Sequence, residues 1–157
     1  MQNDKPLVAS TSLIESTRFK AHGRIDIQMQ DNFLHYDATG PFNEEVFELL
    51  AVAQSNFLSE LTIAGPWASI VTLRNSAMST PGGIQRYTEL MQSPKPAELL
   101  PVATAFVIAP EIEGGRLMTA HFANIYASIN RPFKTFETLN PARAWAESMV
   151  AAASRRA

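Results

Sequence analysis

The sequence contains no cysteine. It therefore forms no disulfide, no thiol nucleophile, no iron–sulfur cluster and no cysteine-based zinc site. Histidine is also scarce, because His22, His35 and His121 are the only three in the chain and they are widely spaced. No spacing of these residues matches a histidine metal motif. We expect no metal and no cofactor.

The chain lacks a basic excess and long apolar runs. Its 13 Lys and Arg oppose 15 Asp and Glu, which gives a net charge of −2, and this balance argues against a nucleic-acid partner. No stretch approaches the roughly 18 apolar residues that a membrane-spanning helix needs. Residues Met1–Thr17 have no basic start followed by an apolar run, so no secretory signal is visible. The expected location is cytoplasmic.

Motifs for common enzyme chemistry are absent as well. The sequence has neither GxGxxG nor GxxxxGK[ST], the motifs for dinucleotides and phosphates, and no GxSxG nucleophile turn. The clearest acid–base pair is His35 with Asp37, two residues apart on one face of an expected strand. Such a pair would suit a hydrolase or lyase as base and orienter, but a solvated sheet face explains it equally well. We expect no catalytic residues and no enzyme.

The hydrophobic content of 46% over 157 residues is typical of one globular domain. We place a single domain at residues 18–152. Residues 1–17 mix polar residues with a few aliphatics and are expected to form a loose leader. Residues 153–157 are expected to fray.

An antiparallel hairpin is expected near the start of the domain. Apolar and polar residues alternate over 24–30 and again over 33–39, which is typical of half-buried strands, and Asp31-Asn32 supplies the turn. A helix follows, with Asn43 as its N-cap and Glu44 in its first turn, where the helix dipole favours negative charge. The apolar stripe of this helix continues to Ala64.

Strands and helices alternate along the rest of the chain. The run 102–109 is almost continuously apolar, so we expect a central strand in which Phe106 and Val107 are both buried. The other expected elements are strands 67–73 and 133–136 and helices that begin near Pro81, Gly115 and Asn140. The order ββαβαβαβα predicts an α/β fold, in which the hairpin precedes a βα superhelix with a mostly parallel sheet.

Five short segments give the chain a family resemblance: Gly40–Glu45 (GPFNEE), Ala109–Glu111, Asn124–Tyr126, Phe136–Thr138 and Ala144-Trp145. Their order and their places among the expected elements resemble the bacterial SpoIIAA-like proteins of the STAS superfamily. The resemblance covers about residues 20–150. It implies a sheet in which strands adjacent in the sequence are neighbours, and a non-enzymatic regulatory or protein-interaction role.

The resemblance also bears on switching and on ligands. Anti-anti-sigma members of the superfamily carry a phosphorylated Ser after an Asp at the start of one helix. The corresponding stretch here, residues 75–82 (NSAMSTPG), lacks the Asp-Ser-x-Gly pattern, although Ser79 and Thr80 occupy a similar location. The same general fold serves lipid carriers, which suggests a small apolar or anionic ligand as the alternative function.

The expected site lies at the carboxyl ends of the parallel strands, where open α/β sheets usually bind ligands. Three loops are expected at this edge, Gly40–Asn43, Asn75–Gly83 and Ala109–Gly115. Free N–H groups at a helix start and nearby hydroxyls would suit an anion or a partner's acceptor groups. The candidate residues for ligand or partner binding are Asn75, Ser76, Ser79, Thr80, Gly82 and Gly83. An ordinary capped helix start, with glycines that permit close packing, accounts for the same residues. The expected partner is a protein, which includes a second copy of the chain, or a small molecule.

Overall fold

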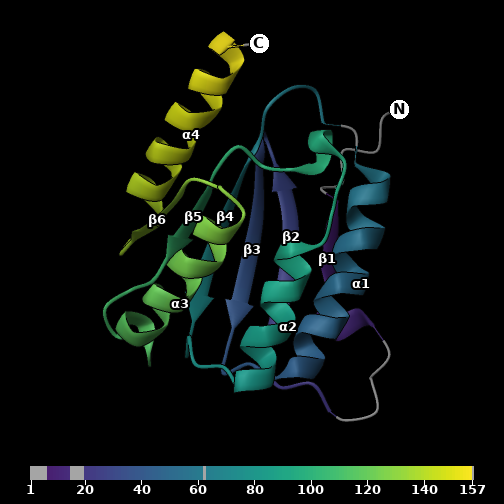
Figure 1. Cartoon of the computed structure of the whole chain (residues 1–157), viewed down its shortest axis with the longest axis vertical. Coiled ribbons are helices and arrows are strands. Elements are labelled where there is room, and N and C mark those ends of the chain that lie inside the picture. The colour runs from purple at the N-terminus through teal and green to yellow at the C-terminus, as the bar shows by residue number, and fades with distance from the viewer. Residues whose placement is uncertain (1–6, 15–19, 62, 157) are drawn as a thin grey trace.

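One six-stranded sheet forms the centre of the molecule (Figure 1). The computed structural model describes residues 7–14, 20–61 and 63–156. Within them the strands follow the order β1-β2-β3-β4-β5-β6, so strands adjacent in the sequence are also neighbours in the sheet. The first two pairings are antiparallel and the other three are parallel. The strands are β1 (Val8–Ser10), β2 (Arg24–Gln30), β3 (Phe33–Thr39), β4 (Ala68–Arg74), β5 (Thr104–Val107) and β6 (Phe133–Phe136).

Helices cover both faces of this sheet. The helices are α1 (Glu44–Glu60), α2 (Pro81–Gln92), α3 (Gly115–Ser128) and α4 (Leu139–Arg156), with two short 3-10 turns, η1 (Thr11–Leu13) and η2 (Ala97–Leu99). Figure 1 shows α1, α2 and α3 side by side over one face, and α4 packs on the other. The α/β fold with a mixed, mostly parallel sheet is therefore confirmed. Within the described residues, none of these helices has the length and apolar character needed to cross a membrane.

The local signals in the sequence form the expected structures. Asp31 has a φ of 55° in the turn between β2 and β3. The side chain of Asn43 accepts a hydrogen bond from the Val46 N–H at 3.2 Å and caps α1. Thr80 caps α2 in the same way, and Pro81 occupies its first turn. These caps satisfy N–H groups that have no partner inside the helix.

The leader differs from the expectation, because it contributes a strand. Ala9 of β1 pairs with Ile27 of β2, and the Thr11 hydroxyl accepts a hydrogen bond from the Ile25 N–H at 3.0 Å. The predicted element order therefore lacked its first strand. A three-residue strand is too short to show a period of two, so the sequence pattern could not reveal it. Residues 1–6 and 15–19 lie outside the described part of the chain.

Two helix ends also differ from the prediction. Helix α1 ends at Glu60 rather than near Ala64, and α4 continues through Arg156 rather than fraying from residue 153. The apolar period of α1 extends beyond its last helical turn because Leu61 and Ile63 pack on the core as part of the following connection. Apolar side chains in a connection can prolong a helical pattern without forming a helix.

The core has two parts, one on each side of the sheet. Phe106 packs with α1, α2 and α3, whereas Val107 faces α4. Their exposed fractions are 2% and 6%, so the prediction that both are buried is confirmed. Strand β5 lies between β4 and β6 and is covered on both faces, which explains its continuous apolar sequence.

Candidate ligand-binding cavity

The structure brings together the three loops that the sequence places at the carboxyl ends of the parallel strands. An isolated bridge joins Phe42 to Ser79, and a second joins Ser76 to Glu113. The backbone N–H of Ala77 also donates to the Glu113 carbonyl at 2.8 Å. The predicted cluster of loops therefore exists.

Polar groups in this cluster bind mainly to one another. Asn75 Nδ2 donates to the Gly40 carbonyl at 2.8 Å, and Ser76 Oγ donates to Glu113 Oε1 at 2.9 Å. Thr80 Oγ1 accepts from the Gly83 N–H at 3.0 Å. These contacts leave few of the expected groups open to a ligand. Binding by this loop stays a prediction, and the hydrogen bonds in place are those of a capped helix start.

The two glycines at the start of α2 permit close packing. A Cβ atom on Gly83 would lie 2.3 Å from Ser79 Oγ and 3.3 Å from the backbone of Asn43, and one on Gly82 would lie 3.0 Å from Glu44 Oε2. Only a residue without a Cβ fits at Gly83 without displacing these neighbours. Ser79 is the one residue of the predicted set that also lines the cavity described below.

His35 and Asp37 lie on one face of β3, as the alternation predicts, but Asp37 contacts a different residue. Asp37 Oδ1 accepts a hydrogen bond from Arg74 Nε at 2.6 Å. His35 Nε2 is buried without a hydrogen-bond partner among the described residues. Burial lowers the pKa of His35 and the charge of Arg143 lowers it further, so its imidazole is neutral at neutral pH. The geometry shows no base–orienter hydrogen bond between the two side chains.

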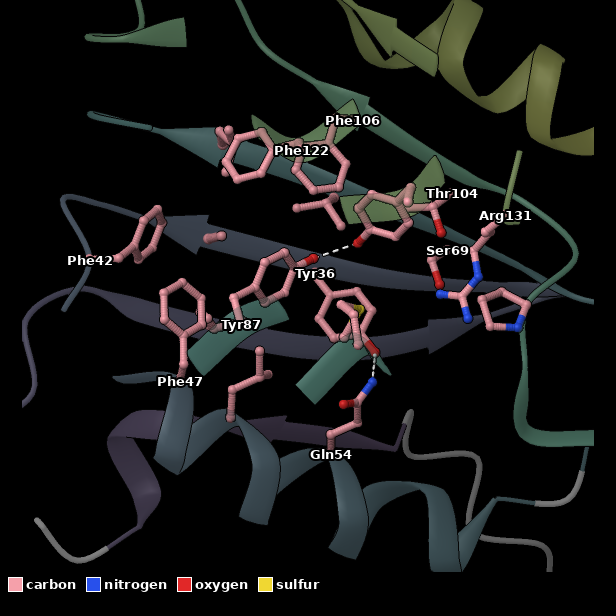
Figure 2. A pocket seen from close by; sticks show the side chains of 18 of the residues that line it. Tyr36, Phe42, Phe47, Gln54, Ser69, Tyr87, Thr104, Phe106, Phe122 and Arg131 are labelled. Carbon is pink, nitrogen blue, oxygen red and sulfur yellow. Dashed lines mark hydrogen bonds between the residues drawn. The ribbon is translucent and has the colours of Figure 1, made fainter. Parts of the chain in front are cut away.

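A cavity lies between the sheet and the three helices α1, α2 and α3 (Figure 2). Its envelope, which includes the open mouth, is about 870 Å³. Side chains from β2, β3, β4, β5, α1, α2 and α3 contribute to its walls, and most of them are apolar. Among these side chains, Phe106 was expected in the core on the sequence alone. Their apolar character is the same in both roles, so composition could not separate a core from a cavity wall.

One end of the cavity is aromatic and lies near the carboxyl ends of the strands. Phe42 and Phe47 occupy this end in Figure 2. Their ring centroids are 5.7 Å apart, and the ring of Phe47 lies 5.2 Å from that of Tyr87. Phe106 and Phe122 add a second pair with a separation of 4.9 Å. Edge and face contacts of this kind hold the walls in place and present apolar surface to the interior.

Tyrosine hydroxyls form a narrow polar belt across the middle of the cavity. Gln54 Nε2 donates to the Tyr36 hydroxyl at 2.8 Å, and the hydroxyls of Tyr87 and Tyr126 bond to each other, as the dashed lines in Figure 2 show. Burial raises the pKa of Tyr126 to about 12 and also raises those of Tyr36 and Tyr87 above their ordinary value. The tyrosines are therefore neutral at neutral pH and serve as hydrogen-bonding groups.

The other end of the cavity is polar and positively charged. Ser69 of β4 lies opposite Thr104 of β5 in the sheet register, and Figure 2 shows both hydroxyls at the same end as the Arg131 guanidinium. Lys95 lines this end as well. Thr104 Oγ1 and Gln54 Oε1 are buried and have no hydrogen-bond partner within the described residues.

This polar end lies at the amino ends of β4 and β5, the sheet edge opposite the one predicted for the site. Ser69 is the second residue of β4 and Thr104 is the first of β5. A second pocket, between α1, the end of α2 and the connection 93–101, shares Gln54, Lys95 and Leu99 with the cavity. Sequence reasoning missed Lys95 and Arg131 because each follows a helix as an isolated cation in a loop.

The described residues of this site do not form a cluster of metal ligands. In residues 7–14, 20–61 and 63–156, no three His, Asp or Glu side chains gather as metal ligands would. Comparison with known proteins gives no relative from which a ligand could be transferred. No protein-family model, no curated protein and no solved structure matches the chain significantly.

Proposed function

We propose that this protein binds a small, largely apolar molecule in the cavity between its sheet and helices α1–α3, as a carrier or sensor. The cavity itself is the observation that supports the proposal. Protein interiors are normally packed as densely as organic crystals. Beneath the three helices, an envelope of about 870 Å³ that includes the open mouth holds about 70 Å³ of space that water molecules can enter with their centres, and its concave, mostly apolar walls are those of a small-molecule site.

The lining has the composition of such a site. Aromatic and aliphatic side chains cover most of the wall, so an apolar ligand would remove both its own surface and theirs from water. A few polar groups converge at one end. One of them, Thr104 Oγ1, is buried without a partner among the described residues, and so is Gln54 Oε1 in the tyrosine belt. Buried polar atoms normally have partners, and a ligand or a water carried with it would supply them.

A binding role is compatible with the regulatory role that the SpoIIAA-like resemblance implies. A sensor binds a small molecule and transmits its presence to a partner without chemistry of its own. The described polar groups support this role better than a catalytic one, because Asp37, the orienter in the pair of His35 and Asp37, bonds to Arg74. We therefore rank a ligand-binding carrier or sensor first and a protein-interaction module that acts without a ligand second.

A neutral fluorescent dye tests the proposal directly. Nile red brightens in apolar surroundings, and we expect saturable binding of one dye per protein. The variant Ala38→Leu adds bulk to the cavity wall, since Ala38 lies on β3 beside the aromatic end. Ala120→Leu makes the same change on the exposed side of α3 and serves as the matched control.

Binding in the cavity requires that Ala38→Leu weakens the dye at least fivefold while Ala120→Leu leaves it unchanged. Thermal melts and circular dichroism of both variants would show that the fold is retained. If the unsubstituted protein gave no saturable signal, or if Ala38→Leu bound the dye as well as the control, the proposal would be wrong.

A further inference from the structure

We infer that the ligand is a single-chain fatty acid of medium length, whose carboxylate lies between Lys95 and Arg131 and whose chain extends toward Phe42 and Phe47. The inference rests on the proposed function and specifies the ligand of the same cavity. It follows from the separation of the walls into a cationic end and an aromatic end, which is the pattern that a molecule with one charged head and one apolar tail would fit.

The cationic end has positive charge without a protein counter-ion. Lys95 and Arg131 both line the cavity and are both partly buried. Among the described residues, no carboxylate lies within 4.0 Å of either. Burial lowers the pKa of Lys95, and the nearby charge of Arg131 lowers it further. An anion between the two cations would remove this repulsion and replace part of the lost hydration.

Hydrogen-bond donors at this end match a carboxylate. The ammonium of Lys95 has three N–H donors and directs them to the carbonyls of Leu90 and Ser93 at 2.9 and 3.4 Å, which leaves one donor for a ligand. Arg131 offers a planar fork, and the hydroxyls of Ser69 and Thr104 can each donate one hydrogen. Gln54 Oε1 is an acceptor, so we expect it to bind a water and not the carboxylate.

The dimensions of the cavity limit the length of the ligand's alkyl chain. Ser69 at the polar end and Leu73 near the aromatic end both line it, four residues apart on β4. At ~3.3 Å per residue this distance is about 13 Å. A C–C bond is about 1.5 Å long and advances less than that along an extended chain, so the distance suits roughly ten carbons. The space open to the centres of water molecules is only about 70 Å³, which favours one slim chain over a two-chain lipid.

A purely structural role explains part of this arrangement. Lys95 caps the carboxyl end of α2, and the Arg131 guanidinium lies 5.9 Å from the centre of the Tyr126 ring. These contacts account for the positions of the two cations. They do not account for the missing counter-ion or for the unpartnered hydroxyl of Thr104. Both features are explained by an anionic head group at this end.

Two ligands of equal chain length distinguish the contribution of the head group to affinity from that of the tail. Decanoate and decan-1-ol would each be used to displace Nile red from the intact protein. Decanoate should bind at least tenfold more tightly than decan-1-ol, because hydrogen bonds to charged groups are stronger than those between neutral groups. Hexanoate and hexadecanoate should both bind less tightly than decanoate.

Charge variants locate the head group. Lys95→Gln and Arg131→Gln should each weaken decanoate by about tenfold or more and leave decan-1-ol within twofold. Arg116→Gln removes an exposed positive charge from α3 and serves as the control. The inference would be overturned if decan-1-ol bound as tightly as decanoate, or if the two variants weakened both ligands equally while their melting temperatures stayed unchanged. The proposed function fails separately, when Nile red itself shows no saturable binding.

Discussion

Thr104 of β5 lies directly opposite Ser69 of β4, and both residues are almost completely buried at the polar end of the cavity. Thr104 has an exposed fraction of 1%, and its hydroxyl oxygen has no hydrogen-bond partner among the described residues. The first residue of a buried strand would ordinarily be apolar at this position. The unpartnered hydroxyl is a cost to the folded protein that a ligand at the polar end would offset.

Replacing the Thr104 hydroxyl should raise the stability of the protein and weaken its binding of decanoate. Thr104→Val keeps the branched shape and removes the buried unpartnered oxygen, so the free energy of unfolding in urea should rise by about 1 kcal/mol. Decanoate should bind a few times more weakly, because one donor is lost. Thr72→Val, on the opposite face of β4, is the control for binding. A fall in stability with unchanged binding would show that Thr104 has a purely structural partner.

Binding of a carboxylate should depend on pH through Lys95. Burial and the charge of Arg131 lower the pKa of Lys95 below its ordinary value of 10.5. Affinity should therefore be full below this lowered pKa and decline as the pH rises above it, since the neutral amine no longer attracts the anion. Calorimetric titration of decanoate at increasing pH measures the decline. Lys95→Gln should flatten the profile, and a wild-type profile that stays flat up to pH 10.5 would exclude Lys95 from the head-group site.

The first strand should contribute measurably to stability. The sequence predicts that residues 1–17 form a loose leader, but β1 pairs with β2 and Thr11 accepts a hydrogen bond from the Ile25 N–H. Thr11→Val leaves that buried donor without a partner, so it should lower the free energy of unfolding by about 1–3 kcal/mol. Urea titration measures the change. A loss below about 0.5 kcal/mol would indicate that the hydrogen bond between Thr11 and Ile25 adds little to the attachment of this segment.

Phe106 tests the packing of the central strand. Its ring contacts Phe122, Tyr126 and Phe133 with centroid separations of 4.9, 5.7 and 5.1 Å. Phe106→Ala should lower the free energy of unfolding by about 3–5 kcal/mol, because it removes these contacts and enlarges the existing cavity. Phe136→Ala, at a partly exposed ring on the edge strand β6, should cost less. Equal losses for the two variants would contradict the central position of β5.

Strong local patterns made most of the fold predictable. The alternation over 24–30 and 33–39 gave both hairpin strands, and Asn43 and Thr80 gave two helix starts. β1 was missed because three residues carry no readable period. The ends of α1 and α4 depend on tertiary packing, which local composition does not encode.

The site was less predictable than the fold, for a physical reason. A cavity and a core are lined by the same apolar residue types. The sequence therefore does not show whether Phe42, Tyr87 and Phe106 fill a core or line a cavity. The polar end is assembled from residues far apart in the sequence, among them Gln54, Lys95 and Arg131. Sequence reasoning favoured the carboxyl edge of the sheet because α/β folds usually bind there, whereas the charged end of this cavity lies at the amino ends of β4 and β5.

The protonation of the bound ligand tests the account most directly. Decanoic acid labelled at its carboxyl carbon would be titrated by NMR while bound to the protein, and its pKa compared with that of the free acid in water. Two adjacent cations should stabilise the carboxylate, so we predict a pKa below that of the free acid. A bound pKa above that of the free acid would place the head group among the aromatic rings and contradict the assignment of Lys95 and Arg131 as its partners.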